Sequence, residues 1–125
     1  MAIKYAVAKN ILVVEDDPDM RKLVASVLRK AGYEVSTATN GLEAASSCLA
    51  RKPDLIISDV HMPTMTGFQM IKVLKAEPGM QDIPVVFLTV DEGRRERSSE
   101  LGAVAYLTKP LRPANLLATV KQHLP

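Results

Sequence analysis

Hydrophobic and polar positions follow a repeating order along the chain, in which a short apolar run precedes a longer stretch with apolar residues at helical spacing. Residues 11–14, Ile-Leu-Val-Val, form the clearest run, which is typical of a strand buried on both faces. Four further runs predict strands at residues 34–38, 55–57, 85–88 and 104–107. Strands that alternate with helices pair in parallel through right-handed crossovers, and the helices cover both faces. The pattern therefore predicts a single-domain α/β fold, a doubly wound (βα)5 sandwich with a five-stranded parallel sheet.

The stretches between the runs carry signals for helix starts and ends. Asp17 before Pro18 predicts an N-cap followed by proline in the first turn, and Asn40 before Gly41 opens a second helix. Apolar residues recur at helical spacing in these two segments, at Met20, Leu23, Val24, Val27, Leu28 and Ala31, and at Ala44, Ala45, Cys48 and Leu49. Three more helices are expected, one with Phe68, Ile71 and Leu74, a strongly polar one from about Asp91 to Leu101, and one that begins near Pro113.

Composition limits the partners and the compartment. The 125 residues suit one domain, and 47% hydrophobic residues are enough for a buried core. A net charge of +2 is too small to indicate nucleic acid or a membrane surface as a direct partner. No apolar run approaches the roughly 20 residues that span a bilayer, and residues 1–10 lack a signal-peptide core. Cys48 has no second cysteine to pair with, and its helical pattern predicts a buried thiol. We therefore expect a cytoplasmic protein.

Polar residues interrupt the apolar runs at one end only, directly after each of four strands. Glu15 and Asp16 follow the first strand, Asp59 follows the third, Thr89 the fourth and Lys109 the fifth. Because parallel strands place their carboxyl ends on one rim of the sheet, these five side chains are expected to converge there. Open α/β sheets bind ligands in the crevice outside that rim.

The residue types at this rim suit phosphoryl transfer. Three neighbouring carboxylates need a positive charge to offset their repulsion, and an all-oxygen ligand set without a Cys or His cluster favours Mg²⁺ or Mn²⁺. A carboxylate can attack phosphorus and carry the phosphoryl group as an acyl phosphate. Asp59 is the expected acceptor, Lys109 offsets part of the developing charge, and the Thr89 hydroxyl can donate to a phosphate oxygen.

Several short motifs at these strand ends resemble the receiver domain of two-component response regulators over nearly the whole chain. The matching pieces are Val13-Val14-Glu15-Asp16-Asp17, Asp59-Val60-His61-Met62-Pro63 with Gly67, Leu88-Thr89, Gly102-Ala103, Tyr106 and Lys109-Pro110. The resemblance implies one receiver domain over residues 1–125, with a core at about 10–124 and the flavodoxin-like strand order 2-1-3-4-5. It is compatible both with a stand-alone receiver and with a piece of a longer regulator.

The resemblance also implies a role for each acidic residue. Asp59 would be phosphorylated by a histidine kinase or a phosphotransfer protein. Asp16 and Asp59 would ligate Mg²⁺ directly, Glu15 would do so through water, and the backbone carbonyl of His61 would complete the protein ligands.

The remaining roles implied by the family concern the switch. Lys109 would pair with the phosphoryl group, and its peptide bond to Pro110 would be cis. Thr89 would move toward the phosphate as the ring of Tyr106 turns inward. The surface that changes, formed by the fourth helix, fifth strand and fifth helix, would bind a downstream protein or effector domain that the sequence does not identify.

Two positions depart from the common family pattern, and two others affect the lifetime of the phosphorylated state in similar proteins. Thr66 stands where an aspartate usually precedes the glycine, and it is expected to cap the next helix. Val90 follows Thr89 where a small alanine is frequent, so it is expected to crowd the acceptor and slow phosphoryl exchange. His61 and Asp91 occupy positions that tune the lifetime of the phosphorylated state in similar proteins.

Other functions compete with a signalling module that is not an enzyme. A Mg²⁺-dependent phosphohydrolase would use Asp59 as a nucleophile in turnover, but His61 stands where a second acid is needed. A vestigial receiver that acts only through protein interactions would not bind Mg²⁺. The basic cluster Arg94, Arg95 and Arg97 is expected to be a solvated helix face, with a docking surface for an acidic partner as the alternative.

Overall fold

The fold is a five-stranded parallel sheet with helices on both faces, and the computed structural model describes residues 8–62, 64–90 and 102–124. The strands lie in the order β2-β1-β3-β4-β5, and each neighbouring pair is parallel. This result confirms the predicted doubly wound sandwich. The strands are β1 (Asn10–Val14), β2 (Glu34–Ala38), β3 (Leu55–Asp59), β4 (Val85–Thr89) and β5 (Ala105–Thr108).

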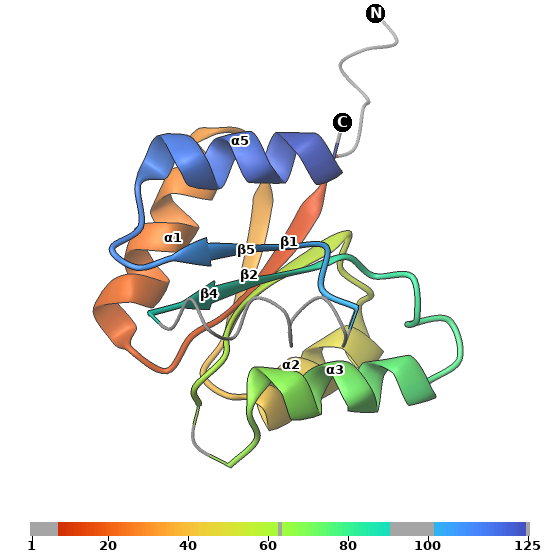
Figure 1. The fold of residues 1–125 in the computed structure, drawn as a ribbon. Helices are drawn as coiled ribbons and strands as arrows, with labels where there is room; N and C mark the ends of the chain where they lie inside the picture. Colours follow the sequence, from red (N-terminus) through yellow and green to blue (C-terminus); the bar gives the residue numbers. More distant parts are fainter. Residues whose placement is uncertain (1–7, 63, 91–101, 125) are drawn as a thin grey trace, which may run out of the picture.

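Two helices cover each face of the sheet in the part of the chain that is described. Figure 1 shows α1 and α5 on one face and α2 and α3 on the other. Their bounds are α1 (Pro18–Lys30), α2 (Gly41–Ala50), α3 (Gly67–Ala76) and α5 (Pro113–His123). The polar helix expected from Asp91 to Leu101, with its three arginines, lies outside the described residues.

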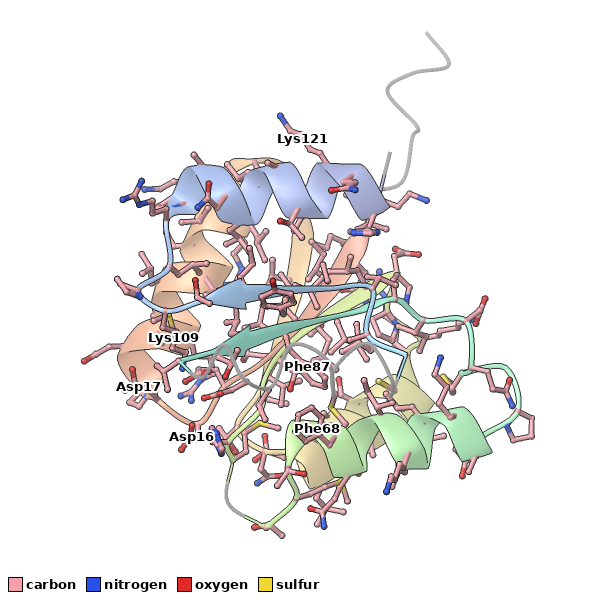
Figure 2. All side chains as sticks on the ribbon, viewed as in Figure 1. Asp16, Asp17, Phe68, Phe87, Lys109 and Lys121 are labelled. Atoms are coloured by element: carbon pink, nitrogen blue, oxygen red, sulfur yellow. The ribbon has the colours of Figure 1, made fainter. Side chains whose placement is uncertain are left out.

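The period-two alternation along the strands divides the core into two layers. In β1, Ile11 and Val13 pack with the residues of α1 and α5, whereas Leu12 and Val14 belong to the layer under α2 and α3. The second layer includes an edge-to-face pair, Phe68 and Phe87, whose ring centroids are 5.3 Å apart (Figure 2). Because both faces are covered, β1, β3 and β4 are buried along their whole length.

The predicted helix starts are confirmed by their capping contacts. The side chain of Asp17 accepts a hydrogen bond from the backbone N–H of Met20 at 3.1 Å, and Asn40 caps α2 in the same way. Thr66 and Gln69 form a reciprocal capping box at the start of α3. Threonine at position 66 therefore performs the capping role expected of it.

Some predicted apolar positions lie at the surface instead of the core. Leu23 and Leu49 are 44% and 63% exposed. The buried stripe of α1 is formed by Val24, Ala25 and Leu28, because this helix packs against both β2 and α5, and the stripe is therefore rotated away from Leu23. The fifth strand begins at Ala105, one residue later than predicted. Cys48 is fully buried, as expected.

Gly67 brings α3 close to the end of β3, and we expect Gly67→Ala to destabilise the protein. A Cβ atom there would lie 2.7 Å from both the carbonyl oxygen of Asp59 and the ring of Phe87. Because neither a backbone carbonyl nor a packed ring can move freely, the expected cost is about 1–3 kcal/mol in urea unfolding.

Gly41→Ala is the matched control for this substitution, because Gly41 is also the first residue of its helix. A Cβ atom at Gly41 would lie 2.8 Å from Cγ and 2.9 Å from Cβ of Met65, so the contact is with one loop side chain instead of a backbone carbonyl and a packed ring, and a smaller loss of stability is expected. Equal stability of the two variants would contradict the steric role assigned to Gly67.

Candidate functional site

The residues singled out by sequence gather at the carboxyl ends of the central strands. Glu15 directly follows β1, while Asp59 and Thr89 are the last residues of β3 and β4. β1 is paired with β2 on one side and β3 on the other, so strand order reverses at β1 and opens a crevice at this rim. The sheet topology therefore brings together side chains that are far apart in the sequence.

Three carboxylates form a compact cluster at this crevice. One oxygen from each of Glu15, Asp16 and Asp59 lies within 4.8 Å of the others. Glu15 and Asp59 are only 1% and 6% exposed, whereas Asp16 faces solvent. The cluster therefore has a buried floor and an open side, through which a cation or a phosphodonor can approach.

Lys109 reaches the acidic cluster from the loop after β5. Its Nζ atom donates to Asp59 Oδ2 at 3.1 Å and to Glu15 Oε1 at 3.3 Å. Figure 2 shows Lys109 and Asp16 at the same end of the sheet. The peptide bond between Lys109 and Pro110 is cis, as the family resemblance implied. The ammonium group thus lies between two buried carboxylates.

The electrostatics of the cluster follow from burial and close charges. The pKa of Glu15 is raised to about 7, first by burial and then by the nearby Asp59 charge, while the Lys109 ammonium opposes both effects. Burial lowers the pKa of Lys109, but its hydrogen bond to Asp59 and the two carboxylate charges outweigh that effect and leave its pKa raised. Near neutral pH the proton on Glu15 is therefore weakly held, and a cation can displace it.

Backbone and hydroxyl groups orient Asp59 more closely than the sequence indicated. The backbone N–H of His61 donates to Asp59 Oδ1 at 3.2 Å, so both oxygens of this carboxylate accept a hydrogen bond. The hydroxyl of Ser58, which is fully buried, donates to the carbonyl oxygen of Asp59 at 2.8 Å. Sequence reasoning did not assign Ser58 a role, because a serine inside a strand gives no signal of its own.

The donor set fits a hard divalent cation. All three clustered side chains offer carboxylate oxygens, which suit Mg²⁺ or Mn²⁺. Among the described residues, Glu15 Oε2 is buried and has no hydrogen-bond partner. A buried polar atom without a partner is costly, so a cation or its bound water at this position would satisfy it.

The two predicted switch residues lie on neighbouring strands. Thr89 is buried at the end of β4, opposite Thr108 of β5. The backbone N–H of Lys109 donates to the carbonyl oxygen of Thr89 at 2.9 Å. Tyr106 is half-buried and packs against the core layer under α2 and α3. Val90, the next residue after Thr89, is 69% exposed. Thr89 is therefore part of the buried floor of the crevice, and Val90 lies at the protein surface.

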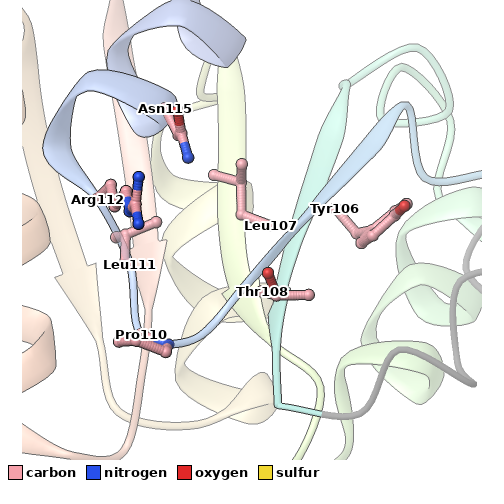
Figure 3. A pocket seen from close by; sticks show the side chains of 7 residues that line it. All are labelled: Tyr106, Leu107, Thr108, Pro110, Leu111, Arg112 and Asn115. Carbon is pink, nitrogen blue, oxygen red and sulfur yellow. The ribbon is translucent and has the colours of Figure 1, made fainter.

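A separate pocket of about 480 Å³ lies beside β5 and the start of α5, and none of the three clustered acids lines it. Figure 3 shows the seven side chains that line it. They are Tyr106, Leu107, Thr108, Pro110, Leu111, Arg112 and Asn115. One wall of this pocket is the segment that carries Tyr106 and leads to Lys109, so the pocket borders the predicted switch.

The comparisons with known proteins agree on one family. A sequence profile described as the response regulator receiver domain matches residues 11–121. The phosphate regulon transcriptional regulatory protein PhoB of Pseudomonas aeruginosa is 38% identical over 117 residues, which is 92% of this chain and 51% of that protein. The chain therefore spans about half the length of this relative.

Two solved structures share the fold closely. The chemotaxis response regulator CheY4 of Vibrio cholerae has a TM-score of 0.89 and 34% identity, with 94% of this chain and 99% of that chain covered. The receiver domain of sensor histidine kinase PA1611 from Pseudomonas aeruginosa PAO1 has a TM-score of 0.87 and 28% identity, with 94% and 98% covered. The PA1611 structure is described with a magnesium ion coordinated in its active site cleft. Among the described residues of this chain, no helix has both the length and the apolar character that a membrane span needs.

Proposed function

Because this chain belongs to the response regulator receiver domain family of two-component systems, we propose that it accepts a phosphoryl group from a histidine kinase or phosphotransfer protein on Asp59. Receiver domains are phosphorylation-dependent signalling modules. The observation that carries the assignment of Asp59 is its contact with Lys109 Nζ at 3.1 Å inside the acidic cluster. The proposed receiver domain has its core at residues 10–124.

The proposed transfer forms one bond and breaks one. An oxygen of the Asp59 carboxylate attacks the phosphorus of a phosphohistidine, the phosphorus–nitrogen bond breaks, and the nitrogen leaves with the electron pair and takes a proton from solvent. The product is an acyl phosphate on Asp59. Water attack on the same phosphorus later releases inorganic phosphate and restores the carboxylate, so the domain assists only its own phosphorylation and dephosphorylation.

The side chains around Asp59 support this chemistry by position and charge. Both carboxylate oxygens are already held by N–H donors, from His61 and from Lys109, which fixes the orientation of the nucleophile. Lys109 carries its positive charge next to the acceptor, where it offsets the charge of the incoming phosphoryl oxygens. Thr89 is the proposed hydroxyl donor to the transferred phosphoryl group.

The cation site would be shared between side chains and backbone. Asp16 and Asp59 would hold Mg²⁺ directly, Glu15 through water, and the carbonyl oxygen of His61 would add a further ligand. A bound Mg²⁺ supplies positive charge that lets a phosphoryl group approach an acidic pocket. The buried, unpartnered oxygen of Glu15 supports this assignment.

The proposed output runs through Thr89 and Tyr106. As Thr89 moves toward a phosphoryl group on Asp59, the ring of Tyr106 moves into the vacated space, and the surface around β5 and α5 changes shape. Tyr106 packs against the core layer under α2 and α3 and is also one of the residues that line the pocket beside α5, which supports this coupling. The downstream partner would be a protein or an effector domain.

The direct test is Mg²⁺-dependent labelling of the purified protein by acetyl phosphate, followed by intact mass spectrometry. We expect a mass gain of one phosphoryl group in the presence of Mg²⁺ and none after chelation with EDTA. Persistent labelling in EDTA would contradict the metal assignment. Sustained release of phosphate from phosphomonoesters would instead indicate a phosphohydrolase. A failure to bind Mg²⁺ would indicate a vestigial receiver.

A further inference from the structure

Arg21 lies one turn into α1 and contacts the backbone of the acidic loop. Its Nη1 atom donates to the carbonyl oxygen of Glu15 at 2.9 Å and lies 3.4 Å from the carbonyl oxygen of Asp16. Side chains on a helix point back toward its N-terminus, so a residue in the first turns of α1 covers the loop that precedes it. The contact joins the helix to two consecutive residues whose carboxylates belong to the cluster.

We propose that Arg21 is a positioning residue for cation binding, which holds the backbone turn of Glu15 and Asp16 so that both carboxylates face the site. This inference rests on the proposed function, since it concerns the same cation site. One side of the turn is fixed already, because the backbone N–H of Glu15 donates to the carbonyl of Ala38 at 3.0 Å. Arg21 holds the carbonyl side of the same turn.

Arg21 acts on the loop in a different way from Lys109. Lys109 forms ion pairs with the carboxylates themselves, and it is the cation that lowers the pKa of Glu15. Arg21 donates to neutral carbonyl groups of the backbone. Its charge also helps to lower the pKa of Glu43 in α2, after the two hydrogen bonds from Thr39 that dominate that shift. Arg21 therefore fixes the geometry of the ligands, and its loss should change cation affinity more than phosphoryl chemistry.

The first test compares Mg²⁺ affinity by isothermal titration calorimetry at a temperature where every variant is folded. Groups that orient metal ligands typically contribute about 10-fold or more to metal affinity. We expect Arg21→Ala and Arg21→Met to bind Mg²⁺ about 10-fold more weakly than wild type, because both remove the donors. Arg21→Met keeps the apolar stem and so protects the test against loss of packing. Arg21→Lys keeps a cationic donor and should restore most of the affinity.

Arg29→Ala is the matched control. Arg29 lies on the same helix and also donates from its guanidinium to a backbone carbonyl, that of Val35, at 3.1 Å. This contact is distant in sequence from the acidic loop and involves none of the clustered acids. Arg29→Ala should therefore leave Mg²⁺ affinity at the wild-type value, and an equal loss in this variant would overturn the positioning role of Arg21.

The second readout separates this inference from the proposed function. With acetyl phosphate, Arg21→Met should need about 10-fold more Mg²⁺ for half-maximal labelling, yet reach a rate close to wild type at saturating Mg²⁺. Wild-type affinity for Mg²⁺ in Arg21→Met would overturn the inference and leave the acceptor assignment intact. Failure of the wild-type protein to be labelled would overturn the proposed function, while the calorimetric comparison would still decide the role of Arg21.

Discussion

Asp59→Asn is expected to abolish Mg²⁺-dependent labelling by acetyl phosphate while the protein stays folded. An amide oxygen is a poor nucleophile, and an acyl phosphate on residue 59 requires a carboxylate. The amide keeps the shape of the side chain and an oxygen that can accept from the backbone N–H of His61. The measurement is intact mass spectrometry after incubation with the phosphodonor, with circular dichroism as a check on folding.

Asp54→Asn is a stringent control for this experiment. Asp54 precedes β3 at the opposite end from Asp59, and its carboxylate accepts the backbone N–H of Asn10 at 2.7 Å. It is therefore an aspartate beside the same strand, with a backbone contact of its own, at the end of the strand away from the acidic cluster. We expect Asp54→Asn to be labelled like wild type. Continued labelling of Asp59→Asn would refute the acceptor assignment.

Lys109→Ala is expected to slow phosphorylation about 100-fold at saturating Mg²⁺. Loss of one donor that stabilises developing charge typically reduces catalysis by about 100-fold to 1,000-fold. Mg²⁺ should bind as tightly as in wild type or more tightly, because the two buried carboxylates lose the ammonium group that now pairs with them. The rate is measured by the time course of labelling, and the affinity by calorimetry.

This prediction is specific because the phosphorylation rate should fall while the affinity for Mg²⁺ should not. Lys52→Ala removes a lysine that pairs with Asp82 at 2.8 Å on the surface, and it should change neither quantity. A Lys109→Ala variant with the wild-type rate would contradict the role of the ammonium group. Together with the Arg21 variants, the experiment separates a residue that stabilises charge from one that positions ligands.

Much of the fold could be predicted from the sequence because the strands are buried on both faces. The run at residues 11–14 contains only apolar residues, so it predicts β1 without any knowledge of tertiary contacts. Helix starts were equally clear, since Asp17 and Asn40 cap their helices by contacts within four residues. Signals of this kind are local, and they survive without knowledge of the fold.

The positions that sequence alone did not settle depend on neighbours from elsewhere in the chain. Leu23 lies in an apolar pattern, but the packing of α1 against β2 and α5 decides which stripe is buried. Glu15 and Asp16 are adjacent acids, yet one is buried and the other exposed, because the loop turns one side chain inward. The sequence shows only a basic residue, Arg21, about one turn after an acidic pair. The structure adds that its guanidinium donates to the backbone of the acidic loop.

The proposed signalling function depends on Asp59 being the residue that carries the phosphoryl group. Borohydride reduces an aspartyl phosphate to homoserine, which marks the modified position permanently for peptide mass spectrometry. After treatment with acetyl phosphate and Mg²⁺, we predict homoserine at position 59 and unmodified aspartate at positions 16, 17 and 54. Homoserine at any of those three positions, with residue 59 intact, would contradict the assignment of Asp59 as the phosphoryl acceptor.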